Sequence, residues 1–423
     1  MQFLTLFFFV LASFPHNVFS QINTAIMPVT KDAKTSLFKV GMTLWQYSSA
    51  ESSYLLDLDA PFTWEDCVMG RLGPTCEDMY ACYLPISCSH SKCIDARSYT
   101  NPICPSLNIT AKYGCHICAV NPVNPVSNIC KISQLTTKIL LLSGTNGRTL
   151  SGPSVNWNYV FSCAPSSLKR SLPEGFKGVA AFSWSTLAFP RQHYDDIVTE
   201  EFALCLPSSS LAPGLTFIGE GPFYFLPNPN LDVMNILSYT PMIRKTPKSL
   251  GYYIKIDKIS LKGTPITLRS LNSSPARLST LVTYTTLRSD IYKSLFTSFS
   301  KATEKIPGVN AVQPFSLCMK ASTIGSTHTK SSVPNIDLEM ESGKIWTISV
   351  DNSMKDTGNG VSCLAFIDGG LRVEDAIVIG TYQMENNFLF FDLGNQTLGF
   401  SSSLLARGTS CSSFNTTIPH YTS

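Results

Sequence analysis

Charged residues and long apolar runs are both scarce in this chain. Lys, Arg, Asp and Glu make up only 14% of the 423 residues, the formal net charge is +3, and no Lys/Arg-rich run occurs. These properties argue against nucleic-acid binding. No stretch after the N-terminal segment reaches the roughly 18 apolar residues that a membrane helix needs. Phosphate-cradling glycine loops and metal-ligand spacings are also missing, so we expect no cofactor and no metal.

The first twenty residues predict a signal peptide. "FLTLFFFVLA" is an apolar core of about ten residues, which is the length of a signal-peptide core and too short to span a bilayer. The small residue Ser20 closes the segment. We therefore predict cleavage after Ser20 and a secreted mature chain.

Cysteine is plentiful, and in an exported chain it predicts disulfides. The motif Cys115-His-Ile-Cys118 could instead be half a zinc site or a redox pair, but the neighbouring spacings do not repeat a zinc-knuckle pattern. The pairing stays open. The fourteen cysteines predicted to form disulfides are Cys67, Cys76, Cys82, Cys88, Cys93, Cys104, Cys115, Cys118, Cys130, Cys163, Cys205, Cys318, Cys363 and Cys411.

Four Asn-x-Ser/Thr motifs predict glycosylation of surface positions in an exported protein. They begin at Asn108, Asn272, Asn395 and Asn415.

Short runs rich in β-branched and aromatic residues, bounded by Gly, Asn, Ser or Pro, predict a mostly antiparallel all-β fold. Helical spacing of apolar residues occurs only at 194–206 and 289–305. The apolar strand and turn at 55–64 is repeated at 278–287, which predicts two similar lobes with both turns at their interface. A Pro/Gly-rich seam at 207–230 indicates the junction. We predict lobes at 21–215 and 216–423.

Several phrases in order along the chain resemble one family. They include "FSCAPSSLKRSLPEGFKGVA" (161–180), "FALCLPSSS" (202–210), "CLAFIDGG" (363–370) and "IVIGTYQMENNFLFFDLGNQTLGFSSSLL" (377–405). The chain resembles the plant xylanase-inhibitor and extracellular dermal glycoprotein group, which includes basic 7S globulins. The resemblance implies a bilobal pepsin-like fold with a few short helices, located in the cell wall or apoplast. Members are typically not proteases, and several block glycoside hydrolases such as xylanases and xyloglucanases.

The catalytic pair of an aspartic protease is incomplete in this sequence. Proteolysis of this kind needs two carboxylates that share one proton. Asp57 supplies the first, but the repeat places Ser279 at the second position, and a hydroxyl holds no negative charge near neutral pH. Asp59 stands where the family's triplet has glycine, and its β-carbon is expected to crowd the turn. We predict that Asp57 and Ser279 are vestigial and that the protein is not an enzyme.

A literal Asp-Thr-Gly triplet also occurs at 356–358. No apolar strand leads into it, and Asn359-Gly360 follows it. We interpret it as a polar turn.

The resemblance also indicates which loops would contact a target enzyme. A glycosidase cleft is lined by two carboxylates, which a cationic side chain can block. In the xylanase-inhibiting branch a histidine does this, but the matching loop here has Arg372 and no histidine. In the xyloglucanase-inhibiting branch arginines of two other loops serve, and those loops carry His328 and Arg407 here. We predict Arg407, His328 and Arg372 as contact candidates, with solvated surface side chains as the alternative.

Two other functions stay open. One is a residual aspartic-type endopeptidase, against which Ser279 stands. The other is a storage, stress or peptide-binding role in the cell wall. A glycoside hydrolase is the partner that the resemblance favours.

Overall fold

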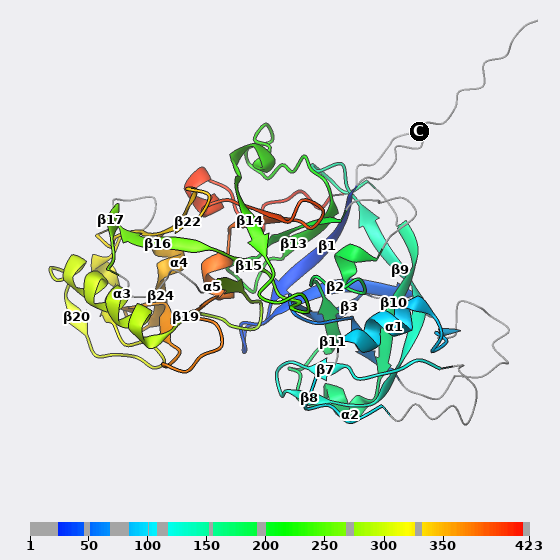
Figure 1. The fold of residues 1–423 in the computed structure, drawn as a ribbon. Coiled ribbons are helices and arrows are strands. Elements are labelled where there is room, and N and C mark those ends of the chain that lie inside the picture. The colour runs from blue at the N-terminus through cyan, green and yellow to red at the C-terminus, as the bar shows by residue number, and fades with distance from the viewer. Residues whose placement is uncertain are drawn as a thin grey trace, which may run out of the picture.

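The computed structural model describes residues 24–45, 51–67, 84–99, 101–107, 117–151, 155–192, 200–267, 275–325 and 332–417. These residues are mostly β-strand with a few short helices. Two lobes lie on either side of a central sheet, the first at the right of Figure 1 and the second at the left. Most strand pairs are antiparallel, so the predicted bilobal all-β fold is confirmed.

The first lobe holds the elements from β2 to η1. They are β2 (Phe38–Trp45), β3 (Ser52–Asp57), β4 (Trp64–Asp66), β5 (Leu84–Pro85), α1 (Ser91–Ser98), β6 (Ala119–Val120), β7 (Val123–Asn124), β8 (Ile129–Cys130), β9 (Ser133–Gly144), β10 (Val155–Ala164), α2 (Ser166–Lys169), β11 (Phe176–Ala181) and η1 (Phe189–Arg191).

The second lobe holds the elements from β15 to α5. They are β15 (Tyr253–Ile254), β16 (Ile256–Leu261), β17 (Thr264–Pro265), β18 (Ala276–Leu278), β19 (Thr285–Leu287), α3 (Ser289–Ala302), β20 (Gly308–Val309), β21 (Cys318–Lys320), η3 (Ala321–Thr323), β22 (Ile336–Met340), β23 (Ile345–Ile348), α4 (Val350–Ser353), β24 (Met354–Gly358), β25 (Val361–Leu364), β26 (Phe366–Asp368), β27 (Ile377–Ile379) and α5 (Thr381–Met384).

A central antiparallel sheet joins the lobes. Its strands, in spatial order, are β1 (Thr24–Lys31), β13 (Gly214–Gly219), β12 (Glu201–Cys205), β28 (Phe388–Asp392), β29 (Thr397–Phe400) and β14 (Ser238–Ile243). At the middle, Phe202 of β12 stacks on Phe391 of β28 with ring centroids 4.4 Å apart. Such stacked pairs add to the free energy of area burial. The predicted lobe boundary at 215/216 lies inside β13 and stays a prediction.

One of the two predicted helices is wrong where the structure describes it. The described part of 194–206 contains strand β12 at Glu201–Cys205, and all of Phe202–Cys205 is buried. Phe202 and Leu204 belong to one apolar cluster, and Ala203 and Cys205 to another. A strand covered on both faces has no alternating pattern, so its sequence resembles that of a buried helix. The helix predicted at 289–305 is confirmed as α3.

The predicted repeat is confirmed by the strand pairing. In the first lobe β3 runs parallel to β11, with Leu56 beside Ala180. In the second lobe β18 runs parallel to β27, with Leu278 beside Ile379. Each lobe therefore delivers one strand end and its following turn to the lobe interface.

Disulfides are present, as predicted for an exported chain. Four pairs are described, namely Cys93–Cys118, Cys104–Cys130, Cys205–Cys411 and Cys318–Cys363. Cys88 is also disulfide-bonded. The predictions for Cys76, Cys82 and Cys115 lie outside the described residues. Cys118 pairs with Cys93, which excludes the alternative of a Cys115–Cys118 zinc or redox pair in this structure.

Two cysteines differ from the disulfide prediction. Cys163 is a buried free thiol, and the Cys67 thiol donates to Glu65 Oε1 over 3.6 Å. Both side chains lie in the apolar core of the first lobe, on or next to the paired strands β10 and β4. Burial keeps both thiols away from solvent.

Two of the predicted glycosylation positions are described. Asn395 is exposed in the turn between β28 and β29, and Asn415 is partly buried near the end of the described chain. Asn108 and Asn272 lie outside the described residues. Glycosylation stays a prediction at all four. Within the described part of the chain, no helix has the length and apolar character to cross a membrane.

Candidate functional site

Asp57 and Ser279 occupy matching positions in the two lobes. Asp57 ends β3 and is 3% exposed, and Ser279 directly follows β18 and is 1% exposed. The Asp59 N–H donates to Asp57 Oδ1 over 2.8 Å, and the Leu281 N–H donates to Ser279 Oγ over 3.2 Å. The serine hydroxyl therefore takes the carboxylate's hydrogen-bonding place in its turn, without a charge near neutral pH.

A single side-chain hydrogen bond is described between these two turns. Thr280 Oγ1 donates to the Leu56 carbonyl oxygen over 2.7 Å, and both groups are buried. The position in the first turn that matches Thr280 holds Leu58, which is fully buried and has no hydroxyl. Leu58 cannot donate a matching side-chain hydrogen bond to the second lobe. Such a bond therefore runs only from the second lobe to the first.

Asp59 fits into its turn, and the predicted crowding does not occur. Arg277 Nη1 of the second lobe donates to Asp59 Oδ2 over 3.4 Å. Gly251 leaves the space for this side chain, since a β-carbon on Gly251 would lie only 2.1 Å from Asp59 Oδ1. A glycine far away in the sequence therefore makes room for the carboxylate.

Arg277 lies between carboxylates of both lobes. Its Nε is 3.2 Å from Asp375 Oδ2, and Lys245 Nζ is 2.7 Å from Asp375 Oδ1. Asp375 is buried, whereas the side chains of Arg277 and Asp59 are 29% and 28% exposed. The charges alternate in sign from Asp59 to Lys245, so each group partly neutralises the next.

Burial raises the pKa of both aspartates in this turn. Burial is the largest cause that raises the pKa of Asp57 to about 7, and the charge of Asp59 adds to it. Backbone N–H groups and Arg277 act in the opposite direction. Burial also raises the pKa of Asp59, against the attraction of Arg277. Asp57 is thus mostly protonated under acidic conditions.

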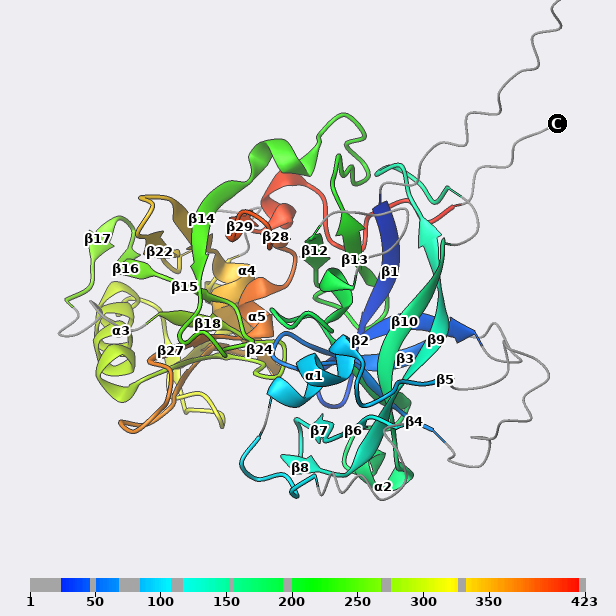
Figure 2. The same ribbon diagram turned by 45° about the vertical axis from the view of Figure 1, so that its right-hand side comes forward.

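These groups form the floor of a cavity of about 540 Å³ between the lobes. Residues of the segment after α1 and of the β7–β8 hairpin line it on the side of the first lobe. Figure 2 shows α1 above the β7–β8 hairpin in this lobe. Lys248 and Leu250 wall it on the other side. Asp57 and Asp59 are the two carboxylates among the described residues that line the cavity, and Asp59 is already paired with Arg277. Among the residues described, no group of three His, Cys, Asp or Glu side chains could hold a metal ion.

The Asp-Thr-Gly triplet at 356–358 ends strand β24, and the polar turn is formed by Asn359-Gly360 directly after it. The Gly358 N–H donates to Asp356 Oδ1 over 2.8 Å, and Gly358 has a φ of +86°. A φ in this region favours glycine. The triplet does not line the cavity at Asp57.

Arg407 lies beside a second hollow, of about 400 Å³, in the second lobe. It ends the short helix η4 (Leu404–Arg407) and is exposed, while Leu405 of the same helix lines the hollow. Gly408 ends the helix in the left-handed conformation, with a φ of +71°. The helix therefore presents Arg407 to solvent next to the hollow.

The loop that carries His328 starts from the lining of the same hollow. Ile324 and Gly325 belong to the lining, and the Ser332 N–H donates to the Ile324 carbonyl oxygen over 2.9 Å. The loop 326–331 therefore leaves and re-enters the described chain at one place. His328 itself lies outside the described residues.

Arg372 is found elsewhere. It is exposed on the loop before β27, and none of residues 369–376 lines the hollow. That loop instead contacts Lys245 through Glu374 and Asp375. Arg407 and both ends of the His328 loop therefore lie at one hollow. Arg372 lies on a different loop, the one whose residues Glu374 and Asp375 form ion pairs with Lys245.

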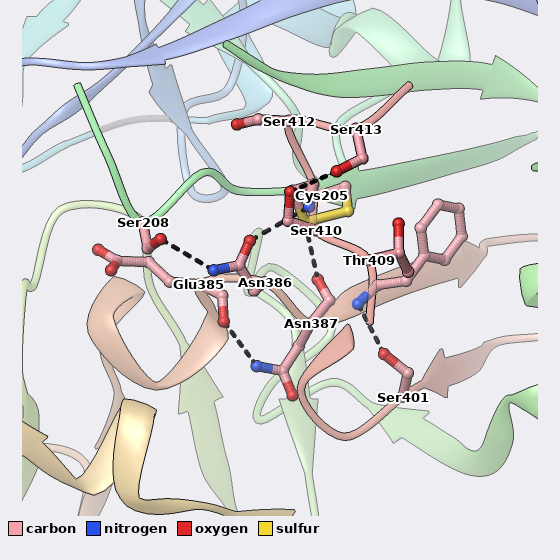
Figure 3. Close-up of a disulfide and its surroundings, with 12 residues drawn as sticks. Cys205, Ser208, Glu385, Asn386, Asn387, Ser401, Thr409, Ser410, Ser412 and Ser413 are labelled. Atoms are coloured by element: carbon pink, nitrogen blue, oxygen red, sulfur yellow. Dashed lines mark hydrogen bonds between the residues drawn. A yellow bond between two sulfur atoms is a disulfide. The ribbon is translucent and has the colours of Figure 1, made fainter. Parts of the chain in front are cut away.

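Sequence analysis missed an ion pair at the hollow. Lys31 Nζ of β1 lies 2.6 Å from Glu385 Oε1, and both side chains are nearly buried. Burial raises the pKa of Glu385 to about 7, against the attraction of Lys31. Figure 3 shows Glu385, Asn386 and Asn387 in a row beside the Cys205–Cys411 disulfide. The polar triplet Glu385-Asn386-Asn387 directly before the apolar run "FLFF" was the available signal.

Comparisons with known proteins agree with this geometry. Family models described as xylanase inhibitor N-terminal and xylanase inhibitor C-terminal match residues 47–220 and 251–402. "Chitinase CLP" of Oryza sativa subsp. japonica is 33% identical over 407 residues, covering 93% of this chain and 91% of its own. "Gamma conglutin 1" of Prunus dulcis is 34% identical over 409 residues, covering 93% and 90%.

The names of relatives differ in the activity that they state. "Probable aspartic proteinase GIP2" of Nicotiana benthamiana is 32% identical over 416 residues, covering 93% of this chain and 92% of its own. Among solved structures, the crystal structure of edgp aligns with a TM-score of 0.80 at 29% identity, covering 94% of this chain and 99% of that chain. The chain therefore belongs to the xylanase-inhibitor family of pepsin-like proteins.

Proposed function

We propose that this protein is a secreted, catalytically inactive pepsin-like protein that binds and inhibits a cell-wall-degrading glycoside hydrolase of the xyloglucanase or xylanase type. The proposed location is the cell wall or apoplast. Membership in a family described as xylanase inhibitors supports a protein partner. The signal sequence and the disulfides support an extracellular site of action.

One observation carries the inhibitory part of the proposal, namely the placement of Arg407. This arginine is exposed at the end of a short helix beside the hollow from which the His328 loop starts. A guanidinium group pairs with carboxylates in a bidentate manner, and two carboxylates line the cleft of most glycoside hydrolases. A short helix pinned next to a disulfide presents such a group with little loss of conformational entropy.

The inactive part of the proposal rests on the missing acid at Ser279. Asp57 is a single buried carboxyl group, and Asp59 is engaged by Arg277. One carboxyl group cannot act as acid and base at once. The first alternative function is a residual aspartic endopeptidase, because one relative is named a probable aspartic proteinase. A storage, stress or peptide-binding wall protein is the second, and the conglutin relative favours it.

A binding experiment with the mature chain separates these functions. The protein from residue 21 onward is immobilised and offered purified xylanases and xyloglucanases of fungal and plant origin. We expect one class to be retained and inhibited. Arg407→Ala should weaken inhibition at least about 30-fold, because loss of a buried interfacial charge typically costs 2 kcal/mol or more.

Two matched variants serve as controls. Arg170→Ala removes an exposed arginine of the first lobe and should leave inhibition unchanged. Arg372→Ala tests whether the cleft loop takes part. Retention of no glycosidase, or equal inhibition by the Arg407→Ala and Arg170→Ala proteins, would contradict the proposal.

A further inference from the structure

An ion pair crosses the floor of the cleft between the lobes. Asp59 belongs to the turn after β3, and Arg277 belongs to β18, 218 residues later. Both side chains line the cavity that also contains Asp57. The pair therefore lies where a ligand in the cavity would approach Asp57.

Arg277 is held firmly on the side of the second lobe. In the sheet its backbone pairs with Tyr253 of β15 and Val378 of β27. Its guanidinium Nε is 3.2 Å from Asp375, which Lys245 contacts in turn at 2.7 Å. The sheet pairing fixes the Arg277 backbone, and Asp375 attracts its guanidinium group without a hydrogen bond to Nε. Contacts within the second lobe therefore determine where the Arg277 guanidinium group lies relative to Asp59.

The segment 246–251 also contacts the first lobe near Asp59. The Trp184 N–H of the first lobe donates to the Leu250 carbonyl oxygen over 3.0 Å. Next to it, Gly251 packs so closely on Asp59 that a β-carbon there would displace the Asp59 carboxyl group from its present position. Asp59 is therefore covered by the second lobe from two directions, by Arg277 and by this segment.

Partial burial strengthens the interaction between the Asp59 and Arg277 side chains. The two side chains are less than a third exposed, so salt screens their interaction less than that of a surface pair. Removing one partner would leave the other charge in the cleft without its counter-ion across the lobes, which is costly in a partly buried site. Either single substitution should therefore weaken the interlobe contacts around Asp59.

We propose that the Asp59–Arg277 pair is an interlobe fastening that ties the turn of Asp57 and Asp59 to β18 and stabilises the contact of segment 246–251 with the first lobe. The fastening is separate from the Arg407 surface, so a variant can lose it and keep inhibition.

Hydrogen exchange of the Trp184 amide tests the fastening, because this amide donates across the lobes. The full mature chain is compared with Asp59→Asn, Arg277→Met and the double variant. We expect each single variant to speed exchange of this amide by about tenfold or more, as local opening becomes easier. The double variant should exchange no faster than the faster single variant, since both substitutions break the same contact.

Lys258→Met is the matched control, because Lys258 forms an exposed ion pair with Glu339 on β16 and β22. It should leave Trp184 exchange unchanged. Unchanged exchange in Asp59→Asn, or a double variant whose acceleration is the product of the two single effects, would overturn the proposal. If Arg277→Met does not fold, Asp59→Asn and Arg277→Lys are compared instead. Arg277→Lys should then exchange more slowly than Asp59→Asn, and the reverse order would overturn the proposal.

Discussion

Replacing Cys205 and Cys411 by alanine is expected to lower the free energy of unfolding by about 5 kcal/mol. The disulfide closes a loop with a sequence separation of 206 residues, so it removes a large part of the entropy of the unfolded chain. It also joins β12 of the central sheet to the segment that follows η4, and both cysteines are fully buried. Its loss should therefore loosen the helix that presents Arg407.

The Cys318–Cys363 disulfide provides a matched control. It lies wholly in the second lobe, with a sequence separation of 45, and its removal should cost about 4 kcal/mol. Guanidinium unfolding under non-reducing conditions, which keep the other disulfides intact, measures both variants by fluorescence and circular dichroism. A smaller loss for the Cys205/Cys411 variant than for the Cys318/Cys363 variant would contradict this account of the long loop.

Asp57→Asn is expected to make the protein more stable at pH 8 and to leave its stability at pH 4 unchanged. Burial raises the pKa of Asp57 to about 7, above its ordinary value of 3.8. A carboxyl group with a raised pKa favours the folded state fully below its unfolded pKa, and that contribution is lost as pH rises toward 7. The asparagine avoids the loss, which amounts to at most about 4 kcal/mol.

Asp66 provides a control of opposite sign. Partial burial opposes the effect, yet the hydrogen bond from Ser166 and the contacts of Lys169 hold the pKa of Asp66 below its ordinary value. Asp66→Asn should therefore lose stability above the ordinary aspartate pKa of 3.8, and this loss should shrink as pH falls toward the lowered pKa of the folded state. Thermal unfolding of both variants between pH 3 and 8 makes the comparison. An Asp57→Asn protein with the same pH slope as the wild type would contradict the account.

Much of the fold could be predicted because the lobes repeat one local plan. The strand-and-turn phrases around Asp57 and Ser279 are similar enough in sequence to align, and the structure places both at the interface. Strand β12 could not be predicted from its pattern, because its two faces are both buried and its residues alternate between two apolar clusters. Long-range packing, not local preference, decides such a segment.

The site was only partly predictable for a related reason. The sequence predicts that Asp59 crowds a tight turn. Nothing near it in sequence indicates that Gly251 and Arg277 accommodate its side chain from the other lobe. The Lys31–Glu385 pair likewise joins residues 354 positions apart. Arg407, in contrast, was predicted from the resemblance of its loop, and its contact role stays a prediction. Ion pairs between lobes depend on the assembled fold, and a single sequence does not show them.

Peptide hydrolysis at acid pH tests the central claim most directly. The mature protein and its Asp57→Asn variant are incubated with a denatured protein substrate from pH 3 to 6, with and without pepstatin. A cleft with one free carboxyl group predicts the same background rate for both proteins, insensitive to pepstatin. Turnover by the wild type that pepstatin blocks and Asp57→Asn abolishes would contradict it.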